Sequence, residues 1–253
     1  MSNTANFSEN INNITTKTSQ LSSWILRTFK ARNPEVMLTL WKSLVIPRFD
    51  YCSQLYNPSK VSQIQQLEMV QRSFLRKIDG MNGLDYWKQL QALKINSSER
   101  RRERYQIIYV WKILEGLVPN LSGSSKIEPR MSDRRGRSCY RQALDRNSYQ
   151  QLRNNSLSIH GVKLFNCIPK KIRNLTNCPK EKFKSELDMF LKLIPDEPQI
   201  PGYTSIRRAD TNSILDMIKV SKERGAACSI SQFQAASSTT ATRWRSEDFG
   251  HDN

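Results

Sequence analysis

The sequence predicts a mainly α-helical protein: an irregular helical bundle, then a basic, loop-rich segment with short helices, then a disordered C-terminal tail. Three observations carry this prediction. Apolar side chains recur at helical spacing through the first half of the chain. A polar, strongly basic stretch follows, and the last part lacks any periodic apolar face. We therefore divide the chain into a helical region (residues 1–121), a basic flexible arm (122–156), a small helical segment (157–195) and a mostly disordered tail (196–253).

The composition points to a polyanionic partner. The 253 residues carry a formal net charge of +17, which suits RNA, DNA or an anionic membrane face. No apolar run reaches the ~20 residues that span a bilayer, and the N-terminus does not read as a signal peptide. The five cysteines are odd in number and irregularly spaced, which favours a reducing, intracellular location, nucleus or cytoplasm.

The sequence gives no reason to expect a cofactor or a metal. His160, Cys167 and Cys178 are imaginable zinc ligands, but their spacing is not that of a zinc site. The chain has no phosphate-binding glycine loop, no serine hydrolase elbow and no zinc protease motif.

The first two helices are predicted from periodicity and caps. Residues 7–29 place Ile11, Ile14, Thr18, Leu21 and Ile25 on one face. The second helix starts at an Asn-Pro-Glu cap at positions 33–35 and should be interrupted by the proline at position 47. The aromatic residues at positions 41, 49 and 51 are expected to be core.

A third helix is predicted over residues 59–78, ending at Asp79-Gly80. Its inward face includes Leu67, Val70 and Phe74. Gln71 and Arg72 have two readings: they bond to neighbouring helix ends, or they touch a template backbone.

The fourth helix begins at Ser97 or Ser98 and stops near Gly116 and Pro119. Its stripe, Ile107, Val110, Trp111, Leu114, Leu117 and Val118, must be buried against something. Four arginines lie in its first turns, where cations are unfavourable. Either they are a solvated helix start eased by neighbouring glutamates, or they contact phosphate.

The basic arm offers a second phosphate-binding candidate, with Tyr140 placed to stack a base, against the alternative of an ordinary basic loop. Ordered structure should return near Leu157, include a short amphipathic helix over 183–191, and end after Pro195. One more weak helix is expected beyond it, over 211–220. The candidate nucleic-acid-binding residues are Arg100, Arg101, Arg102, Arg104, Arg134, Arg135, Arg137, Arg141, Lys170, Lys171 and Arg173.

Several phrases resemble one known family. They are LWKSLVIPRFDYC (residues 40–52), EMVQR (68–72), ERRR followed by YVWKILEG (99–116), VKLFNCIP (162–169) and FKSELDMFL (183–191). They resemble the region downstream of the polymerase palm in non-LTR retrotransposon reverse transcriptases of the jockey- and LINE-like group. Departures are Asn10 for a usual His, Asp50 for Glu and Phe165 for Trp. The resemblance covers roughly residues 5–205 and begins almost at Met1, as if a start codon lay inside an older reading frame.

The resemblance implies a thumb-like helical region that grips template, primer and element RNA through sugar-phosphate contacts. The paired aspartates that hold the polymerase metals are missing, since no Asp-Asp occurs, so we expect no polymerase activity from this chain. We expect a non-catalytic remnant that binds RNA or DNA without sequence specificity. The alternatives are a helical module that docks on intact reverse transcriptase, and a decayed reading frame without function.

Overall fold

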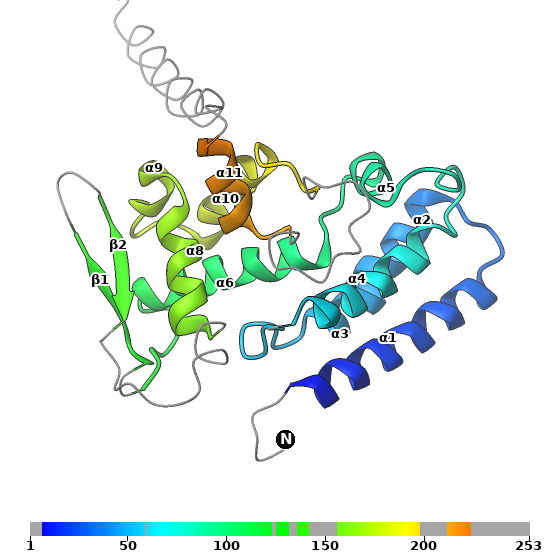
Figure 1. Cartoon of the computed structure of the whole chain (residues 1–253), viewed down its shortest axis with the longest axis horizontal. Helices are drawn as coiled ribbons and strands as arrows, with labels where there is room; N and C mark the ends of the chain where they lie inside the picture. The colour runs from blue at the N-terminus through cyan, green and yellow to red at the C-terminus, as the bar shows by residue number, and fades with distance from the viewer. Residues whose placement is uncertain are drawn as a thin grey trace, which may run out of the picture.

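The computed structural model describes residues 7–58, 60–122, 125–131, 136–141, 156–197 and 212–223. The protein is mainly α-helical, as the sequence predicts, with one two-stranded sheet in the described part (Figure 1). Two clusters of buried hydrophobic side chains form its core, one built before residue 96 and one built after residue 106. Residues 132–135, 142–155 and 224–253, which hold most of the predicted arm and tail, lie outside the described residues.

The N-terminal cluster is enclosed by the elements that precede Ile95. Asn33 caps α2 by accepting the Glu35 amide at 2.9 Å, as its sequence predicts. Trp41 and Phe74 stack at the centre, 4.6 Å apart, and both are fully buried. The elements are α1 (Ser8–Thr28), α2 (Pro34–Leu40), the π-helical turn η1 (Trp41–Val45), α3 (Ile46–Asp50), α4 (Val61–Leu75) and α5 (Tyr86–Leu93).

Two expectations for the second helix are wrong. Pro47 does not interrupt it, because the wider π-helical turn η1 absorbs the missing amide and the chain continues into α3 with Pro47 in its first turn. Tyr51 is not core: its side chain is 74% exposed, since the helix ends at Asp50 and the chain turns away. Trp41 and Phe49 are buried, as predicted.

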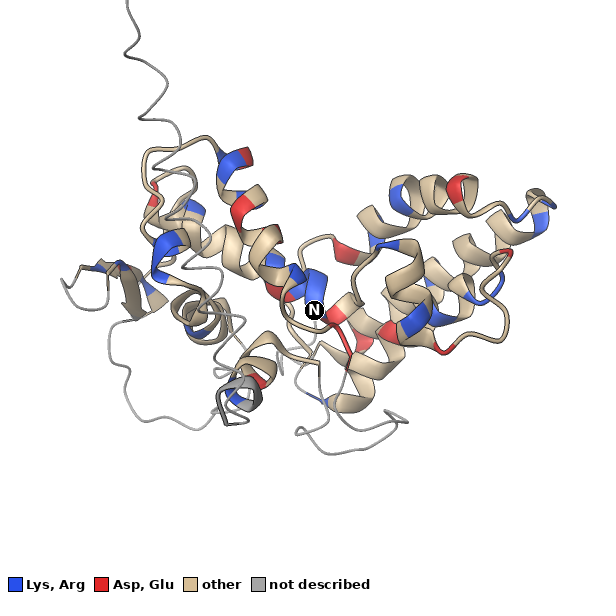
Figure 2. Cartoon of the chain, turned by 90° about the horizontal axis from the view of Figure 1, so that it is seen from above, with Lys and Arg blue, Asp and Glu red and all other residues tan. Residues whose placement is uncertain are grey.

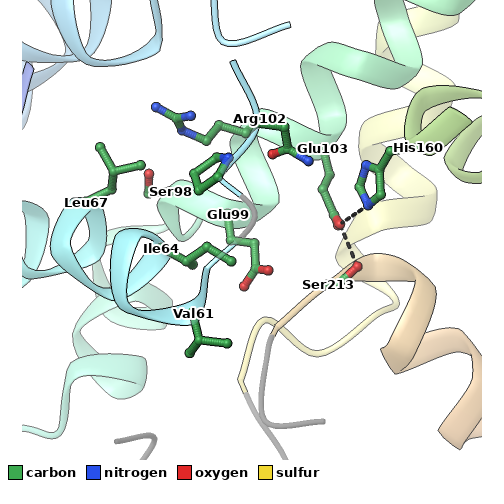
Figure 3. Close-up of a pocket in the computed structure, with 11 residues that line it drawn as sticks. Val61, Ile64, Leu67, Ser98, Glu99, Arg102, Glu103, His160 and Ser213 are labelled. Atoms are coloured by element: carbon green, nitrogen blue, oxygen red, sulfur yellow. Dashed lines mark hydrogen bonds and ion pairs between the residues drawn. The ribbon is translucent and has the colours of Figure 1, made fainter. Parts of the chain in front are cut away.

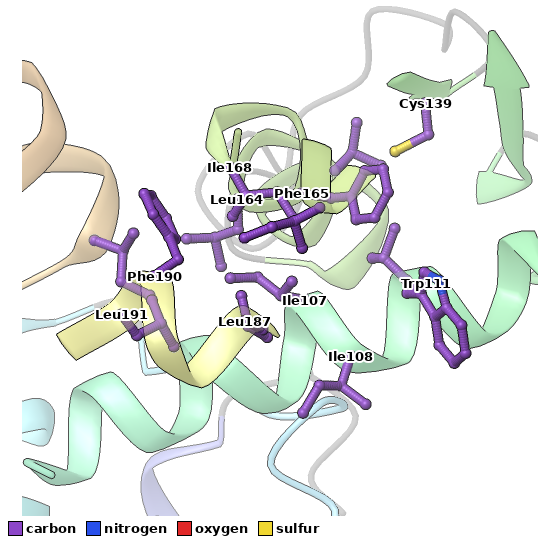
Figure 4. Close-up of a cluster of buried hydrophobic side chains, with 14 of the residues drawn as sticks. Ile107, Ile108, Trp111, Cys139, Leu164, Phe165, Ile168, Leu187, Phe190 and Leu191 are labelled. Atoms are coloured by element: carbon purple, nitrogen blue, oxygen red, sulfur yellow. The ribbon is translucent and has the colours of Figure 1, made fainter. Parts of the chain in front are cut away.

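Helix α6 (Ser98–Leu114) joins the two clusters. Its C-terminal half supplies Ile107, Val110 and Trp111 to the second cluster. Figure 4 shows Ile107 and Trp111 on this helix, with Leu164, Phe165 and Leu187 of the same cluster nearby. Trp111 stacks on Phe183 at 4.5 Å. Of the predicted stripe, Leu117 is instead 57% exposed, because it lies beyond the end of the helix. The remaining elements of this cluster are β1 (Ile127–Arg130), β2 (Ser138–Arg141), η3 (Leu157–Gly161), α8 (Val162–Cys167), α9 (Lys170–Arg173), α10 (Lys180–Lys192) and α11 (Ile214–Glu223).

Part of the predicted flexible arm is a packed hairpin. β1 and β2 pair antiparallel, and Ile127 and Cys139 are buried against the second cluster. The Asn120 side chain bonds to the backbone of β1 as a neighbouring strand would. It accepts a hydrogen bond from the Ile127 amide at 3.0 Å and donates one to the Ile127 carbonyl at 2.7 Å. Asn166 does the same for Cys139, at 3.0 and 2.7 Å. These amide side chains fix the hairpin without a wider sheet.

Candidate nucleic-acid interface

The first turn of α6 is built by carboxylates and hydroxyls. Ser97 caps the helix by accepting the Arg100 amide at 3.2 Å, as predicted. The Ser98 amide donates to both oxygens of Glu68, at 3.0 and 3.1 Å. A carboxylate at this position offsets the partial positive charge of the helix N-terminus. Burial raises the pKa of Glu68, and its hydrogen bonds to Tyr86 and Ser98 only partly offset that rise.

Arg101 lies inside the protein and binds three groups from the N-terminal half. Its Nε donates to Asp50 at 2.9 Å, and its Nη1 donates to Gln71 Oε1 at 2.6 Å and to the Asn96 carbonyl at 2.9 Å. Gln71 therefore has the structural role predicted as one of two alternatives, a bond to a neighbouring helix end. Arg72 lies over the Tyr86 ring at 4.7 Å, so it too packs against a neighbouring helix.

Arg100 and Arg102 are buried on opposite sides of the same turn. Arg100 reaches the second half of the chain, donating to the Pro195 carbonyl at 2.8 Å and lying 3.7 Å from Asp196. Arg102 reaches the first half, donating to the Tyr56 hydroxyl at 3.2 Å with its guanidinium over that ring at 4.8 Å. From this one helix, Arg100 and Arg102 therefore bond to the two halves of the chain that form the two hydrophobic clusters.

The predicted phosphate contact at the start of α6 is therefore corrected. Arg100, Arg101 and Arg102 are 1%, 8% and 3% exposed, so a phosphate cannot reach them in this conformation. Arg104 is half-buried and forms a two-pronged pair with Asp188, at 2.5 and 2.7 Å. The close ion pairs of these arginines are with residues distant in sequence: Asp196 for Arg100, Asp50 for Arg101 and Asp188 for Arg104. Of the expected pairs with glutamates three residues away, the one between Arg100 and Glu103 acts over a longer range, since the charge of Arg100 lowers the pKa of Glu103.

Beside the arginines lies a small cavity lined by Glu99, Glu103, His160 and Ser213 (Figure 3). Glu103 accepts from the Ser213 hydroxyl at 2.5 Å and from the Ile214 amide at 2.6 Å, which caps the start of α11. Its other neighbour is His160 Nε2 at 3.7 Å. Burial raises the pKa of Glu103 to about 7, although these hydrogen bonds pull it down. Burial and the charge of Glu103 raise the pKa of Glu99 well above its usual value.

This cavity does not have the geometry of a hydrolase. Ser213 donates to the carboxylate rather than to His160, and His160 Nδ1 lies 2.8 Å from Gln106 Oε1, so nucleophile and base are not joined. The cavity volume is about 40 Å³. Small-molecule sites occupy roughly 300–1,000 Å³. The cluster therefore holds α11 against α6 rather than binding a metabolite.

The candidates in the arm and in α9 differ in how far they are buried. Arg137 is buried, 2.5 Å from Glu115, and donates to the Leu114 carbonyl at 3.1 Å, so its predicted surface role is corrected. Arg173 is partly buried and donates to the Arg137 carbonyl at 2.6 Å. Lys170 and Lys171 are exposed on α9. Arg134 and Arg135 lie outside the described residues, and Arg141 is described only as the end of β2.

Exposed cations occur on most helices of the described part (Figure 2). On α1, Lys17 and Arg27 are exposed on either side of an exposed Trp24. These three residues were not predicted from the sequence as candidates for binding. Their signal in the sequence was a tryptophan on the polar face of an amphipathic helix. No helix in the described residues is long and apolar enough to cross a membrane, and no group of three or more potential ligands there is placed to hold a metal ion.

No family model, no curated protein and no solved structure matches this chain.

Proposed function

We propose that this chain is a non-catalytic nucleic-acid-binding module, derived from the post-palm region of a non-LTR retrotransposon reverse transcriptase. The sequence phrases quoted above support the derivation. One observation supports the binding: Arg101 and Arg137 are paired with carboxylates inside the fold, so their burial does not use up the excess of cations that the composition gives.

The charge separation can be followed residue by residue. Asp50 and Glu115 are committed to the buried Arg101 and Arg137, and Glu68 and Glu103 are buried at helix starts. Each internal pair removes one positive and one negative charge from the surface, so pairing does not lower the excess of positive charge, which is +17 over the full sequence. A polyanion is attracted by that excess, with a strength that falls as salt rises.

α9 and its surroundings support one contact region within this proposal. Lys170 and Lys171 are exposed there, and Lys163 is exposed on the adjoining α8. The hairpin packs beside them, since the Arg137 amide donates to Asn174 at 2.8 Å. The sequence between β1 and β2 contains Arg134 and Arg135, which lie outside the described residues.

The binding half of the proposal is tested by titrating purified protein with labelled RNA and DNA at several salt concentrations. The logarithm of affinity should fall linearly with the logarithm of salt, by roughly 0.7 per phosphate contact on single strands and 0.9 on duplexes. Lys170→Gln with Lys171→Gln should flatten that slope by about 1–2. The matched control is Lys88→Gln on α5 with Lys94→Gln just after the end of that helix. Absence of binding at low salt would overturn the proposal.

The non-catalytic half is tested by primer extension with magnesium or manganese. The chain lacks the paired aspartates that position two metal ions, so we expect no product. Templated extension by the pure protein would contradict this half and leave the binding half untouched.

A second candidate is a helical module that docks on intact reverse transcriptase. It is favoured by adjacent apolar exposure after α3, where Tyr51 and Leu55 are 74% and 67% exposed. Leu55→Asp should abolish co-purification with a co-expressed full-length enzyme while leaving nucleic-acid affinity unchanged. If nucleic acid does not bind and Leu55→Asp abolishes such a complex, docking takes first place.

A further inference from the structure

Helices α1 and α4 lie side by side (Figure 1). Residues of both helices line a shallow surface groove. Amide side chains of α4 tie the two together: Gln63 donates to Ser8 at 2.6 Å and Gln66 donates to Asn12 at 2.9 Å. The groove has a volume of about 710 Å³ and is open along its length. Its lining residues on α1 run from Thr15 to Arg27, which is about 18 Å along a helix.

Most of the residues that line the groove are polar, and none of them is acidic. Hydroxyls and amides predominate: Ser19, Gln20 and Ser23 come from α1, and Gln66 and Ser73 from α4. The two helices contain one acid each. Glu9 lies at the far end of α1, and Glu68 is buried, accepting from Ser98 and Tyr86 on another side of α4. Neutral donors of this kind are those that proteins use against sugar and phosphate oxygens.

Arg27 lines the groove, and Trp24 and Lys17 are exposed on the same helix next to residues that line it. Trp24 is 49% exposed, and the positions four before and three after it on the same helix face are Gln20 and Arg27, both in the groove lining. Lys17 is exposed one further turn toward the N-terminus. An exposed tryptophan between two cations is a platform for a flat, negatively charged partner.

We propose that the α1–α4 groove binds single-stranded nucleic acid, with the sugar-phosphate backbone along its hydroxyls and a base stacked on Trp24. This rests on the proposed nucleic-acid binding and assigns it a site away from α9. A single strand fits better than a duplex, because bases in a duplex are stacked on each other and cannot cover an indole. A protein helix fits less well, because Met69 and Val70 are the apolar side chains of the groove lining and form no stripe along it.

The test uses labelled uridine and thymidine homopolymers of about 16 nucleotides, and the hybrid duplex of the same length. Trp24→Ala should weaken binding to both single strands by roughly 5- to 100-fold and leave the duplex nearly unchanged, because stacking contributes about 1–3 kcal/mol per base. Trp24→Phe should restore most of the loss, since a smaller ring still stacks. Arg27→Gln should lower the salt slope on single strands by roughly 0.7, whereas the matched change Lys88→Gln on α5 should not.

Intrinsic fluorescence gives a second readout. Among the described tryptophans, Trp41, Trp87 and Trp111 are buried, so single strands should quench the emission of Trp24. Trp244 lies outside the described residues, so the measurement uses a Trp244→Phe background; adding Trp24→Phe should then abolish the quenching. The melting temperature of each variant is the control for folding, and an exposed side chain should change it little.

The outcomes separate this inference from the proposed function. If the wild-type protein binds no nucleic acid, both fail. If it binds but Trp24→Ala binds single strands equally well without loss of quenching, this site is wrong while binding elsewhere, such as α9, stands. Equal weakening for single strands and duplex would also overturn it, because a stacking platform must discriminate between them. A larger effect with uridine than with thymidine strands would assign the site to RNA, and the reverse would assign it to DNA.

Discussion

Helices α6 and α1 both carry cations and a tryptophan, but they use them in opposite ways. In α6 the arginines at positions 100–102 are buried and bonded to carboxylates and carbonyls, and Trp111 is fully buried. In α1, Lys17 and Arg27 are exposed and Trp24 is half exposed. The denser charge run is thus the internal one. What decides the difference is the availability of carboxylates in the surrounding fold, not the local density of charge.

The physical reason is the cost of burying charge. A guanidinium leaves water only if other acceptors replace the water that it loses. For Arg102 these are the Tyr56 hydroxyl and the Tyr56 and Phe49 carbonyls, whereas its neighbours in the sequence have carboxylates. Asp50, Asp188 and Asp196 provide those carboxylates to α6 from three distant segments. α1 packs against α4, whose one acid is already bound to the start of α6, so the cations of α1 remain in solvent.

The sharpest contrast is between the two tryptophans. Trp111→Ala should destabilise the protein by about 3–5 kcal/mol, since it removes a ring stacked on Phe183 and an indole that donates to the Leu175 carbonyl at 2.9 Å. Trp24→Ala should cost no more than about 0.5 kcal/mol. Chemical unfolding of both variants measures the difference. Similar losses would show that exposure does not separate these two side chains.

A buried and an exposed cation should differ in the same way as the two tryptophans. Arg101→Ala should destabilise by about 3–5 kcal/mol, because it leaves Asp50 buried without its partner and Gln71 without a donor. Lys17→Ala, its exposed counterpart on α1, should stay within about 0.5 kcal/mol. If Arg101→Ala leaves stability intact and weakens nucleic-acid binding instead, the α6 arginines are a binding site after all.

The third contrast concerns pH. The pKa of Glu103 is raised to about 7 in the folded protein, mainly by burial, so the folded state holds a proton that the unfolded chain has lost. Stability from this group is complete below about pH 4.5 and is lost as pH rises through 7. Unfolding at pH 5 and pH 8 should therefore differ by about 1–3 kcal/mol, with the acidic side more stable.

Glu103→Gln should reduce that difference, because it removes the titrating group and keeps an acceptor for Ser213 and Ile214. Glu99, whose pKa is also raised by burial and by the charge of Glu103, should leave a residual dependence of the same sign. Glu197→Gln, at an exposed position, is the matched control. An unchanged pH dependence in Glu103→Gln would show that Glu103 ionises normally.

The local features of the fold were predictable from sequence, because they depend on neighbouring residues. The Asn33 and Ser97 caps, the end of α6 near Gly116 and the burial of Trp111 follow from local rules. The continuation of the helix through Pro47 and the hairpin at Ile127 were missed. The first needed a π-helical turn, and the second is fixed by amides at positions 120 and 166.

The site was harder to predict than the fold, because it depends on which charges meet across the chain. The sequence places Arg137 in a flexible basic arm, whereas in the structure it is buried against Glu115. Arg100 pairs with Asp196, almost a hundred positions later, in a segment expected to be near the end of order. Charge counting finds the excess of cations but cannot find which of them are internal.

Arginine-specific labelling with a dicarbonyl reagent, read residue by residue by mass spectrometry, tests most directly whether α6 uses its arginines for structure and α1 for binding. In the free protein, Arg27 should react quickly, whereas Arg100, Arg101 and Arg102 should react only on unfolding. Adding a single-stranded oligonucleotide should protect Arg27 and leave the three α6 arginines unchanged. Rapid labelling of the α6 arginines in the folded protein, suppressed by the oligonucleotide, would contradict the account.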